Sequence, residues 1–439
     1  MGYQIGIRRE DRYKWERRVP LIPQDAKELA QKHGIEIIAQ PSTKRVFADE
    51  EYRQAGITVS DSLAPCPVIF GIKEIPIPAL EKGKTYVFFS HTTKGQPYNM
   101  PMLKRILELG CTLIDYEKVT DENGRRLIFF GRYAGLAGMI DTLWALGKRL
   151  AWEGISSPFE PVDRALEYAN LAAAKEAIRL VGEQIKNEGL PVAIVPLVVG
   201  FAGYGNVSRG AQEILDLLPV REIAPKELPS FTAGKGPSRD VIYKIVFTEE
   251  DMVEPIDAGR PFNLQDYYEH PKSYRSIFER YLPYLSVLVN AIYWKPIYPR
   301  LLTKETVRRL FAEGQPSLRL IGDISCDVEG AIECTVKTTE QDDPIYVYDP
   351  VTDSAITGMA GNGPVILAVD ILPSELPREA SVYFSGVLKS YIPAIVRADF
   401  SGSFESCELP LTIKRAVIAY RGELTPAYRY IEKHLERSV

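Results

Sequence analysis

The chain has 439 residues, 45% of them hydrophobic and 25% charged, values typical of folded globular proteins rather than disordered, collagen-like or coiled-coil chains. At roughly 150 residues per domain, this length predicts two or three domains, each able to bury a core. Lys and Arg number 53 against 58 Asp and Glu, and this net charge of −5 disfavours a nucleic-acid binder, whose domains usually carry a basic excess.

The first residues, the cysteines and the histidines narrow the class further. The N-terminus is charged from residue 8 onward and lacks the apolar segment of a secretory signal, and the longest apolar run, 190–205, is too short to cross a bilayer. Five scattered cysteines without CxxC spacing are typical of reduced cytosolic thiols, and no two of the four histidines lie close in sequence. We therefore expect a cytoplasmic protein with no metal site, whose partners are small molecules rather than membranes or nucleic acids.

The first 130 residues alternate between strand-like and helix-like segments, which favours a parallel α/β sheet. Short apolar segments predict the strands, and apolar residues at helical spacing predict the helices. The expected strands are Tyr3–Ile7, Glu36–Ala39, Val68–Ile72, Tyr86–Phe89 and Thr112–Tyr116, and the expected helices are Pro23–His33 and Met102–Leu109.

The middle of the chain continues this pattern with longer elements. Tyr133–Trp152 has apolar residues every three to four positions and predicts a long buried helix that connects two lobes, and Asp163–Asn187 predicts another helix. Pro191–Gly200 is rich in β-branched residues, as in a strand that is buried on both faces. Further strands are expected at Val241–Phe247, Val287–Ile292 and Leu318–Asp323.

Two remaining stretches differ from this alternation. Pro225–Glu269 is rich in proline, glycine and charge, and it predicts an elaboration of the second lobe. The C-terminal Pro377–Val439 is mostly helical in pattern, and we expect it to pack back on the first lobe.

A glycine-rich turn follows the buried strand and approximates the dinucleotide-binding fingerprint. In Gly203-x-Gly205-x-x-Ser208 the first glycine permits a tight turn, the second lets the backbone approach a pyrophosphate, and serine occupies the usual third-glycine position. The helix that starts here offers free N–H groups to negative charge, and Gly210 and Ala211 would keep it slim for packing on the sheet. A tight turn without a ligand is the alternative, but the strand before it and the helix after it favour cofactor binding.

The strand after this helix helps to distinguish NAD from NADP as the expected cofactor. Its tip normally carries an acid for the ribose 2′-hydroxyl, but the next segment places Ala224 there, with Lys226 and Arg209 nearby. The missing acid removes a clash with a 2′-phosphate, so NADP is slightly favoured over NAD. Glu222 or Glu227 could still serve as the acid, which keeps NAD open.

Two candidates for acid–base chemistry follow strands of the first lobe. Lys73 ends one apolar strand and His91 follows another, and the ends of adjacent parallel strands are where α/β proteins collect catalytic groups. A desolvated lysine has a lowered pKa and histidine titrates near neutrality, so both suit proton transfer. Taken singly, the lysine is more often a surface charge and the histidine a structural residue; their parallel placement favours a catalytic pair.

The segment Arg8–Arg18 carries six positive and three negative residues. Its simplest interpretation is a solvated loop. Its functional interpretation is a carboxylate clamp, because arginine binds carboxylates through two parallel hydrogen bonds. Arg125 and Arg126, which follow Gly124, offer a second such fork in the same lobe.

Segments along nearly the whole chain carry a family resemblance. The N-terminal third contributes RREDRYKWERRVPLIP, FGIKEIP, FFSHTTKGQ, LIDYEKVTDENGRR and FFGRYAGLAGMID. The glycine turn contributes GYGNVSRGAQEI, and later stretches are DYYEHPKSYRSIFERYLPY, LVNAIYWKPIYPRLLT, GDISCDVEGAIE and AVDILPSELPREAS. Together and in this order they resemble the lysine–2-oxoglutarate reductases, which include the lysine-forming saccharopine dehydrogenases, within the broader alanine dehydrogenase and transhydrogenase superfamily.

The resemblance implies an α/β fold of two Rossmann-like lobes with parallel sheets and an active-site cleft between them. The first lobe, 1–135 with 378–439, would be discontinuous and would bind substrate and carry catalysis, and 136–377 would bind the dinucleotide. Lys73 of the GxKE motif and His91 of the SH motif match the family's acid–base pair. Positions that match its substrate ligands or cleft lining are Arg18, Glu74, Lys94, Glu117 and Arg126, and those that match its cofactor-binding segments are Gly203, Gly205, Asn206, Val207, Ser208, Asp323, Asp327 and Leu372.

The resemblance further implies that the chain interconverts L-lysine, 2-oxoglutarate and NAD(P)H with saccharopine and NAD(P) through an imine. Another amino-acid dehydrogenase of the superfamily, alanine dehydrogenase-like, and a non-catalytic nucleotide-binding protein are the alternatives. A homo-oligomer and a separate saccharopine-oxidising enzyme stay open as partners. Many relatives are fused to such a second enzyme, and we expect this chain, which ends at Val439, to be the reductase alone.

Overall fold

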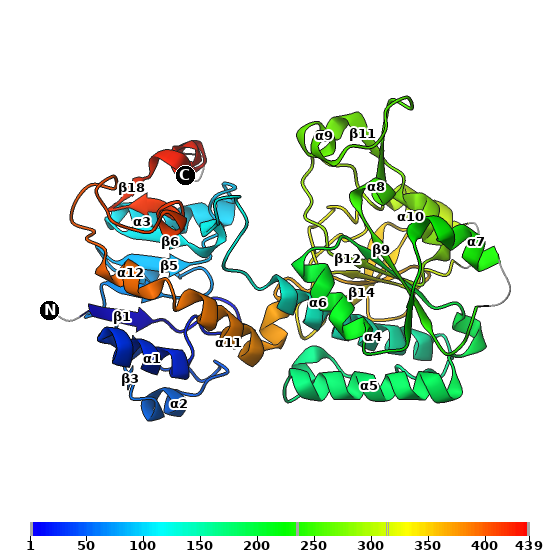
Figure 1. Ribbon diagram of the computed structural model, residues 1–439, viewed down its shortest axis with the longest axis horizontal. Helices are drawn as coiled ribbons and strands as arrows, with labels where there is room; N and C mark the ends of the chain where they lie inside the picture. Colours follow the sequence, from blue (N-terminus) through cyan, green and yellow to red (C-terminus); the bar gives the residue numbers. More distant parts are fainter. Residues whose placement is uncertain (1–2, 234–236, 313, 315, 437–439) are drawn as a thin grey trace. The chain divides into compact units, whose positions relative to one another are not determined.

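The computed structural model describes residues 3–233, 237–312, 314 and 316–436, and the chain divides into two compact units (Figure 1). Unit 1 comprises Met1–Phe130 and Pro377–Val439, and unit 2 comprises Gly131–Leu376. Each unit contains its own eight-stranded sheet.

The sheet of unit 1 has the strand order β18-β17-β6-β5-β4-β1-β2-β3. The strands from β6 to β3 run parallel, whereas β17 and β18 pair antiparallel at the other edge. The strands are β1 Tyr3–Ile7, β2 Ile35–Ala39, β3 Thr58–Val59, β4 Val68–Phe70, β5 Thr85–Phe88, β6 Thr112–Asp115, β17 Val417–Tyr420 and β18 Glu423–Leu424. The helices are α1 Pro23–His33, α2 Asp49–Gln54, α3 Met100–Glu108, α11 Pro377–Leu388, α12 Ile392–Arg397, α13 Leu411–Lys414 and α14 Glu432–Leu435.

Helix α1 begins and ends where the sequence predicts. Proline occupies its first position, where a missing N–H costs nothing, and Ala26 and Leu29 form part of its buried face. Gly34 ends the helix in the left-handed region, with φ of +66°, and donates its N–H to the carbonyl oxygen of Ala30 at 3.1 Å.

The C-terminal segment is less helical than its pattern predicts. The prediction is correct for α11 and α12, but Val417–Tyr420 forms strand β17, which pairs with β6. All four residues of β17 are buried, as expected for a strand that joins the sheet of unit 1. A short apolar run of this kind does not reveal by itself whether it is helix or strand.

The sheet of unit 2 has the order β15-β14-β16-β13-β12-β7-β9-β8. The six strands from β16 to β8 run parallel, and β14 and β15 add an antiparallel edge. The predicted α/β class with two mostly parallel sheets is thus confirmed. The strands of this sheet are β7 Val198–Ala202, β8 Val220–Glu222, β9 Ile242–Phe247, β12 Val287–Asn290, β13 Leu320–Asp323, β14 Ile345–Asp349, β15 Ser354–Thr357 and β16 Val365–Leu367. The strands β10 Val253–Pro255 and β11 Tyr274–Ser276 form a separate two-stranded antiparallel sheet. The helices are α4 Gly131–Trp152, α5 Leu171–Glu188, α6 Asn206–Leu215, α7 Leu228–Ala233, α8 Glu249–Met252, α9 Leu264–Glu269 and α10 Lys304–Ala312.

Two elements of unit 2 start later than predicted. Strand β7 begins at Val198 rather than Pro191, because Val192–Ile194 forms a 3-10 turn and a proline has no N–H for the ladder. Helix α5 begins at Leu171, where the side chain of Asn170 accepts a hydrogen bond from the N–H of Ala173 and caps the helix.

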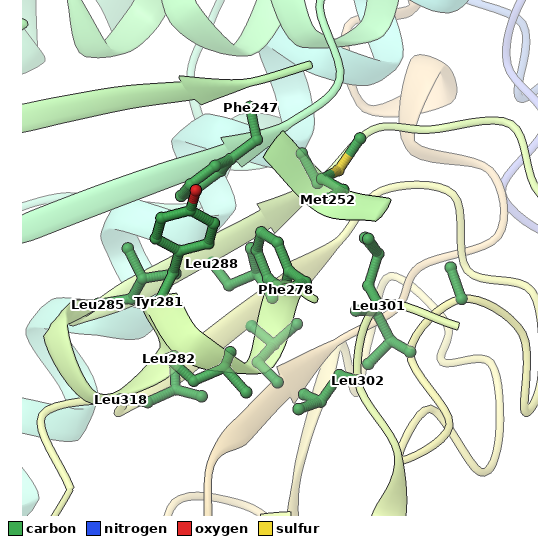
Figure 2. Close-up of a cluster of buried hydrophobic side chains, with 14 of the residues drawn as sticks. Phe247, Met252, Phe278, Tyr281, Leu282, Leu285, Leu288, Leu301, Leu302 and Leu318 are labelled. Carbon is green, nitrogen blue, oxygen red and sulfur yellow. The ribbon is translucent and has the colours of Figure 1, made fainter. Parts of the chain in front are cut away.

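Apolar side chains in the core of unit 2 hold the segment between β9 and β12 in place. Figure 2 shows Phe247, Met252, Phe278 and Tyr281 lying together beside strands of the sheet, and all four are at most 4% exposed. Burying one such side chain contributes roughly 1.5–3 kcal/mol. Residues 248–251 therefore lie between two buried anchors at the carboxyl end of β9.

Candidate functional site

Lys73 and His91 lie at the same edge of the unit 1 sheet. β4 pairs in parallel with β5, and each residue comes three positions after the end of its strand. The N–H of Phe89 donates to the carbonyl oxygen of Ile72 at 3.0 Å and extends the pairing beyond the strands. His91 has φ of +47°, a conformation that non-glycine residues rarely adopt and that is found at functional sites.

Glu74 connects these two residues. Its Oε1 lies 2.7 Å from His91 Nδ1 and accepts a hydrogen bond from Asn99 Nδ2 at 3.1 Å. Burial would raise the pKa of Glu74, but the hydrogen bond and charge of His91, with the charge of Lys73, lower it to about 2. An ionised carboxylate cannot donate, so we assign the proton of this hydrogen bond to His91 Nδ1, which leaves Nε2 for other chemistry.

Asn99 holds the histidine and the glutamate in place, and the sequence did not predict it. Its side chain is fully buried, and Nδ2 also donates to the carbonyl oxygen of Ser90 at 3.1 Å. Its Oδ1 accepts from Arg12 Nη1 at 3.0 Å. Arg12, Asn99 and Glu74 thus form a chain of hydrogen bonds that ends at His91.

Glu10 holds the backbone that carries Lys73. Its two carboxylate oxygens accept hydrogen bonds from the N–H groups of Ile72 at 2.6 Å and Lys73 at 3.0 Å. Burial raises its pKa to about 7, although the charge of Arg8 and the two N–H groups act in the opposite direction. The sequence alone identifies Glu10 only as one of three acids in a basic segment.

Asp115 at the end of β6 anchors the segment that follows β5. Its Oδ2 accepts hydrogen bonds from the N–H and the hydroxyl of Ser90, and its Oδ1 accepts from the N–H of Glu117 at 2.8 Å. The Ser90 hydroxyl also bonds Thr92 at 2.8 Å. Burial raises the pKa of Asp115. The residues on both sides of His91 are therefore held by one buried acid.

Arg18 forms a buried ion pair with Glu16 in unit 1. It is 3% exposed, and its Nε and Nη2 donate to the Glu16 carboxylate at 2.8 and 2.5 Å. The guanidinium lies 4.1 Å from the centroid of the Phe130 ring. Burial would raise the pKa of Glu16, but the charges of Arg18 and Lys73 lower it. Glu16 therefore lies within electrostatic range of Lys73 and orients Arg18, a role that charge counting along the segment could not show.

Of the other predicted site residues of unit 1, Arg126 and Lys94 are exposed and Glu117 is partly buried. Arg126 Nη2 forms an ion pair with Glu117 Oε1, and the arginine side chain is 49% exposed. Lys94 is exposed, in a turn that is closed by the hydrogen bond from the N–H of Gly95 to the carbonyl oxygen of Thr92 at 2.9 Å. The structure thus brings Arg126 and Glu117 into contact, and it gathers Lys73 and His91 around Glu74, whose side chain is 1% exposed.

In unit 2 the glycine turn joins β7 to α6. Gly203 has φ of +93°, and a Cβ there would lie 2.9 Å from the side chain of Ile292, so glycine is required. A Cβ at Gly205 would meet no atom within 4 Å. Asn206 is the first residue of α6, and the first N–H groups of a helix have no acceptor within the helix. Ser208, in the third-glycine position, is fully buried.

Gly210 packs against a helix. A Cβ at Gly210 would lie 2.1 Å from the carbonyl oxygen of Arg132 on α4, and a Cβ at Gly135 on α4 would lie 1.9 Å from the carbonyl oxygen of Val207. The two helices therefore contact backbone to backbone. The sequence predicts that Gly210 allows α6 to pack closely on the sheet. Instead, Gly210 allows α6 to pack closely against helix α4.

Strand β7 lies between β12 and β9, and β8, the strand that follows α6 in sequence, is not its neighbour. β9 pairs with both β7 and β8, and β8 forms the edge of the sheet. Ala224 follows this edge strand, as predicted, but the strand does not adjoin β7, so Ala224 does not lie beside the glycine turn. Burial explains the order, because five of the six residues of β9 are buried whereas β8 is partly exposed.

Asp323, Asp327 and Leu372 occupy different environments. Asp323 is 1% exposed and accepts hydrogen bonds from Asn290 Nδ2 at 2.8 Å and the Thr335 hydroxyl at 2.6 Å. Burial raises the pKa of Asp323 to about 6. Leu372 is 1% exposed and packs near Gly138 of α4, whereas Asp327 is exposed on the segment after β13.

Metal-binding clusters and membrane-spanning helices are both absent from the described ranges. Across residues 3–233, 237–312, 314 and 316–436, no group of three or more His, Cys, Asp or Glu side chains is arranged to hold a metal ion. No helix within these ranges has the length and apolar content needed to span a bilayer.

Known proteins resemble the chain along most of its length. Residues 6–137 match the family described as "Alanine dehydrogenase/PNT, N-terminal domain". The chain is 41% identical over 444 residues to "Alpha-aminoadipic semialdehyde synthase" of Arabidopsis thaliana, which covers 98% of this chain but 41% of the relative. It is 26% identical over 391 residues to "Saccharopine dehydrogenase [NAD(+), L-lysine-forming]" of Emericella nidulans, covering 85% of this chain and 87% of the relative. The chain thus spans less than half of the plant relative, and the resemblance inferred from the sequence motifs is confirmed.

A solved structure supports the fold. An L-alanine dehydrogenase superposes with a TM-score of 0.61 at 18% identity, covering 98% of this chain and 99% of the other. At this identity the likeness concerns the fold alone, and it agrees with two Rossmann-like units.

Proposed function

We propose that the chain is an oxidoreductase that interconverts L-lysine, 2-oxoglutarate and a reduced nicotinamide dinucleotide with saccharopine and the oxidised dinucleotide. The observation that carries the proposal is the strand-end cluster of Lys73, Glu74 and His91, found in a chain 41% identical along 98% of its length to an alpha-aminoadipic semialdehyde synthase. The name of the fungal relative, a lysine-forming saccharopine dehydrogenase of similar length, supports the same reaction.

The glycine turn of unit 2 suits a nicotinamide dinucleotide. The left-handed Gly203 makes the turn, the open space at Gly205 admits a phosphate, and the first N–H groups of α6, from Asn206 to Ser208, would face its charge. Bound there, the dinucleotide supplies or accepts a hydride. Asp327 and Leu372 are proposed toward its nicotinamide end, and Asp323 would position the segment that carries Asp327 through its hydrogen bond from the N–H of Cys326 at 3.1 Å.

His91 and Lys73 would move protons between the reacting nitrogen and oxygen. When the ε-nitrogen of lysine bonds to the keto carbon of 2-oxoglutarate, the nitrogen loses a proton and the oxygen gains one. A second proton on that oxygen lets it leave as water and forms the protonated imine. His91 Nε2 is suited to accept and return these protons, because Glu74 fixes the ring through Nδ1. Lys73 is the second proton-transfer group, and its backbone is held by Glu10.

Cationic side chains of unit 1 would bind the substrate carboxylates. Arg18 would use Nη1, since Glu16 engages Nε and Nη2. Arg126 is exposed enough to exchange its partner Glu117 for a carboxylate, and Lys94 adds a positive charge. Glu74 and Glu117 would bind the ammonium groups of lysine.

The test is oxidation of NADH or NADPH by the purified chain with lysine and 2-oxoglutarate, compared with omission of either substrate. We expect oxidation that depends on both substrates, and saccharopine as the product by mass spectrometry. Absence of lysine-dependent oxidation with either dinucleotide would contradict the proposal. Oxidation with pyruvate and ammonia instead would indicate an alanine dehydrogenase-like enzyme, and binding of a dinucleotide without any turnover would indicate a non-catalytic nucleotide-binding protein.

A further inference from the structure

The carboxyl end of β9 lies directly beside the glycine turn. β7 and β9 pair in register with Ala202 opposite Phe247, and the N–H of Gly203 donates to the carbonyl oxygen of Phe247 at 3.1 Å. In dinucleotide-binding folds the strand next to the first one ends where the adenosine ribose binds. The residues after Phe247, and not those after β8, therefore face this part of a bound dinucleotide.

Three acids follow Phe247, and they differ in how they are engaged. Asp251 Oδ2 accepts hydrogen bonds from the N–H and the hydroxyl of Thr248, both at 2.8 Å, and is thus used to start helix α8. Glu249 Oε1 accepts from the Tyr268 hydroxyl at 2.6 Å. Glu250 is exposed, with no hydrogen bond or ion pair among the described residues.

Glu249 is the acid that lies next to the glycine turn. Burial and, after it, the Glu249 carboxylate raise the pKa of Tyr204, the residue between Gly203 and Gly205. Glu249 is therefore within interaction range of the turn itself. The buried side chains of Phe247 and Met252 fix the backbone on both sides of it (Figure 2).

We propose that Glu249 accepts a hydrogen bond from the 2′-hydroxyl of the adenosine ribose, so that the chain selects NAD(H) over NADP(H). This inference rests on the proposed function and names its cofactor. A carboxylate forms a strong hydrogen bond with the hydroxyl, whereas it repels a 2′-phosphate that carries up to two negative charges. Glu250, one residue further, adds to that repulsion.

The cations that favour NADP in the sequence do not lie on the segment after β9. Lys226 follows the edge strand β8, which β9 separates from β7. Arg209 lines a shallow hollow on α6 together with Glu213 and Asp216. Neither residue follows β9, so the slight preference for NADP is replaced by a preference for NAD.

The test measures binding and turnover separately. Dissociation constants of NADH and NADPH for the full chain are measured by isothermal titration calorimetry, with 5′-AMP and 2′,5′-ADP as probes that differ only in the 2′-phosphate. We expect NADH to bind at least about tenfold more tightly than NADPH, the strength of one hydrogen bond to a charged group. Glu249→Gln should reduce this ratio about tenfold or more, and the matched variant Glu250→Gln should reduce it less than threefold.

Equal or tighter binding of NADPH by the unmodified chain would overturn the inference, as would an unchanged ratio in Glu249→Gln. Preference for NADH that Glu249→Gln removes, with no lysine-dependent turnover, would support this inference while contradicting the proposed reaction. Absence of binding by either dinucleotide would overturn both.

Discussion

Replacing Glu10 with glutamine perturbs a buried carboxyl group next to Lys73. The group accepts two backbone hydrogen bonds, and burial raises its pKa from 4.5 to about 7. The folded chain therefore binds the proton more tightly than the unfolded chain, so this group favours folding below pH 4.5, and its contribution is lost as the pH rises through 7. Glutamine has no such titration.

The magnitude follows from the pKa of Glu10 in the two states. A rise from 4.5 to about 7 corresponds to about 3 kcal/mol, most of which falls between pH 5 and pH 9. Glutamine offers one acceptor oxygen instead of two, and one unsatisfied N–H costs about 1–3 kcal/mol at every pH. We therefore expect Glu10→Gln to be less stable than the unmodified chain at pH 5, and the difference to move by about 2–3 kcal/mol in favour of the variant by pH 9.

Urea unfolding at pH 5, 7 and 9 measures this difference. Glu122→Gln removes the same charge at an exposed turn and is the control, and its effect should stay within about 0.5 kcal/mol. The change with pH, rather than the loss at one pH, is decisive, because the lost hydrogen bond contributes equally throughout. A destabilisation by Glu10→Gln that stays constant from pH 5 to pH 9 would refute the reasoning.

Further variants test the two proposed sites. Lys73→Met and His91→Gln should each lower kcat by about 10²–10⁴, as measured by steady-state kinetics on variants that urea unfolding shows to be folded. Glu74→Gln should lower kcat by about 10- to 100-fold, because His91 loses a charge-assisted hydrogen bond. Gly205→Ala should weaken NADH binding about tenfold or more at unchanged stability, because its methyl group would enter the open space at the turn. Gly203→Ala should instead destabilise the chain by about 1–3 kcal/mol, because φ there is +93°.

Matched controls separate these effects from general disturbance. The exposed Lys82 and His270 provide Lys82→Met and His270→Gln, which should keep full activity. Full activity in both Lys73→Met and His91→Gln would show that the assigned pair is wrong. Equal loss of stability in Gly203→Ala and Gly205→Ala would contradict the different roles given to the two glycines.

Elements whose ends are set by their own residues could be predicted from the sequence. Gly34 ends α1 because only a residue tolerant of positive φ continues the chain there, and the glycine turn marks the start of α6. The strand-end rule likewise identified Lys73 and His91. In each case the signal lies within a few residues of the feature.

Strand order could not be predicted in the same way. The prediction assumed that the strand after α6 lies beside β7, whereas β9 takes that place and β8 is the edge. A signal was present, because Ile242–Phe247 is a nearly continuous apolar run, as a central parallel strand requires, and Val220–Glu222 is two-thirds charged. Strand β17 is a different case, since its partner β6 lies some 300 residues away.

The residues that support Lys73 and His91 could not be predicted from the sequence either. Glu10 meets the N–H groups of Ile72 and Lys73 across 62 and 63 residues, and Asn99 meets Glu74 across 25. No local pattern separates these side chains from other glutamates and asparagines. Only the fold decides which acids are buried, and burial makes them influence Lys73 and His91.

A count of charges along a segment overstates the positive charge that a substrate meets. Of the six basic residues between Arg8 and Arg18, Arg8 pairs with Asp11 at 2.5 Å and Arg18 with Glu16 at 2.5 Å. Both side chains of the second pair are at most 3% exposed, and separating such a buried pair would leave an uncompensated charge. A substrate carboxylate would therefore join this pair through Arg18 Nη1 rather than displace Glu16. Arg18 would then contribute direction to substrate binding, and the exposed Arg126 would contribute charge by exchanging Glu117 for the substrate carboxylate.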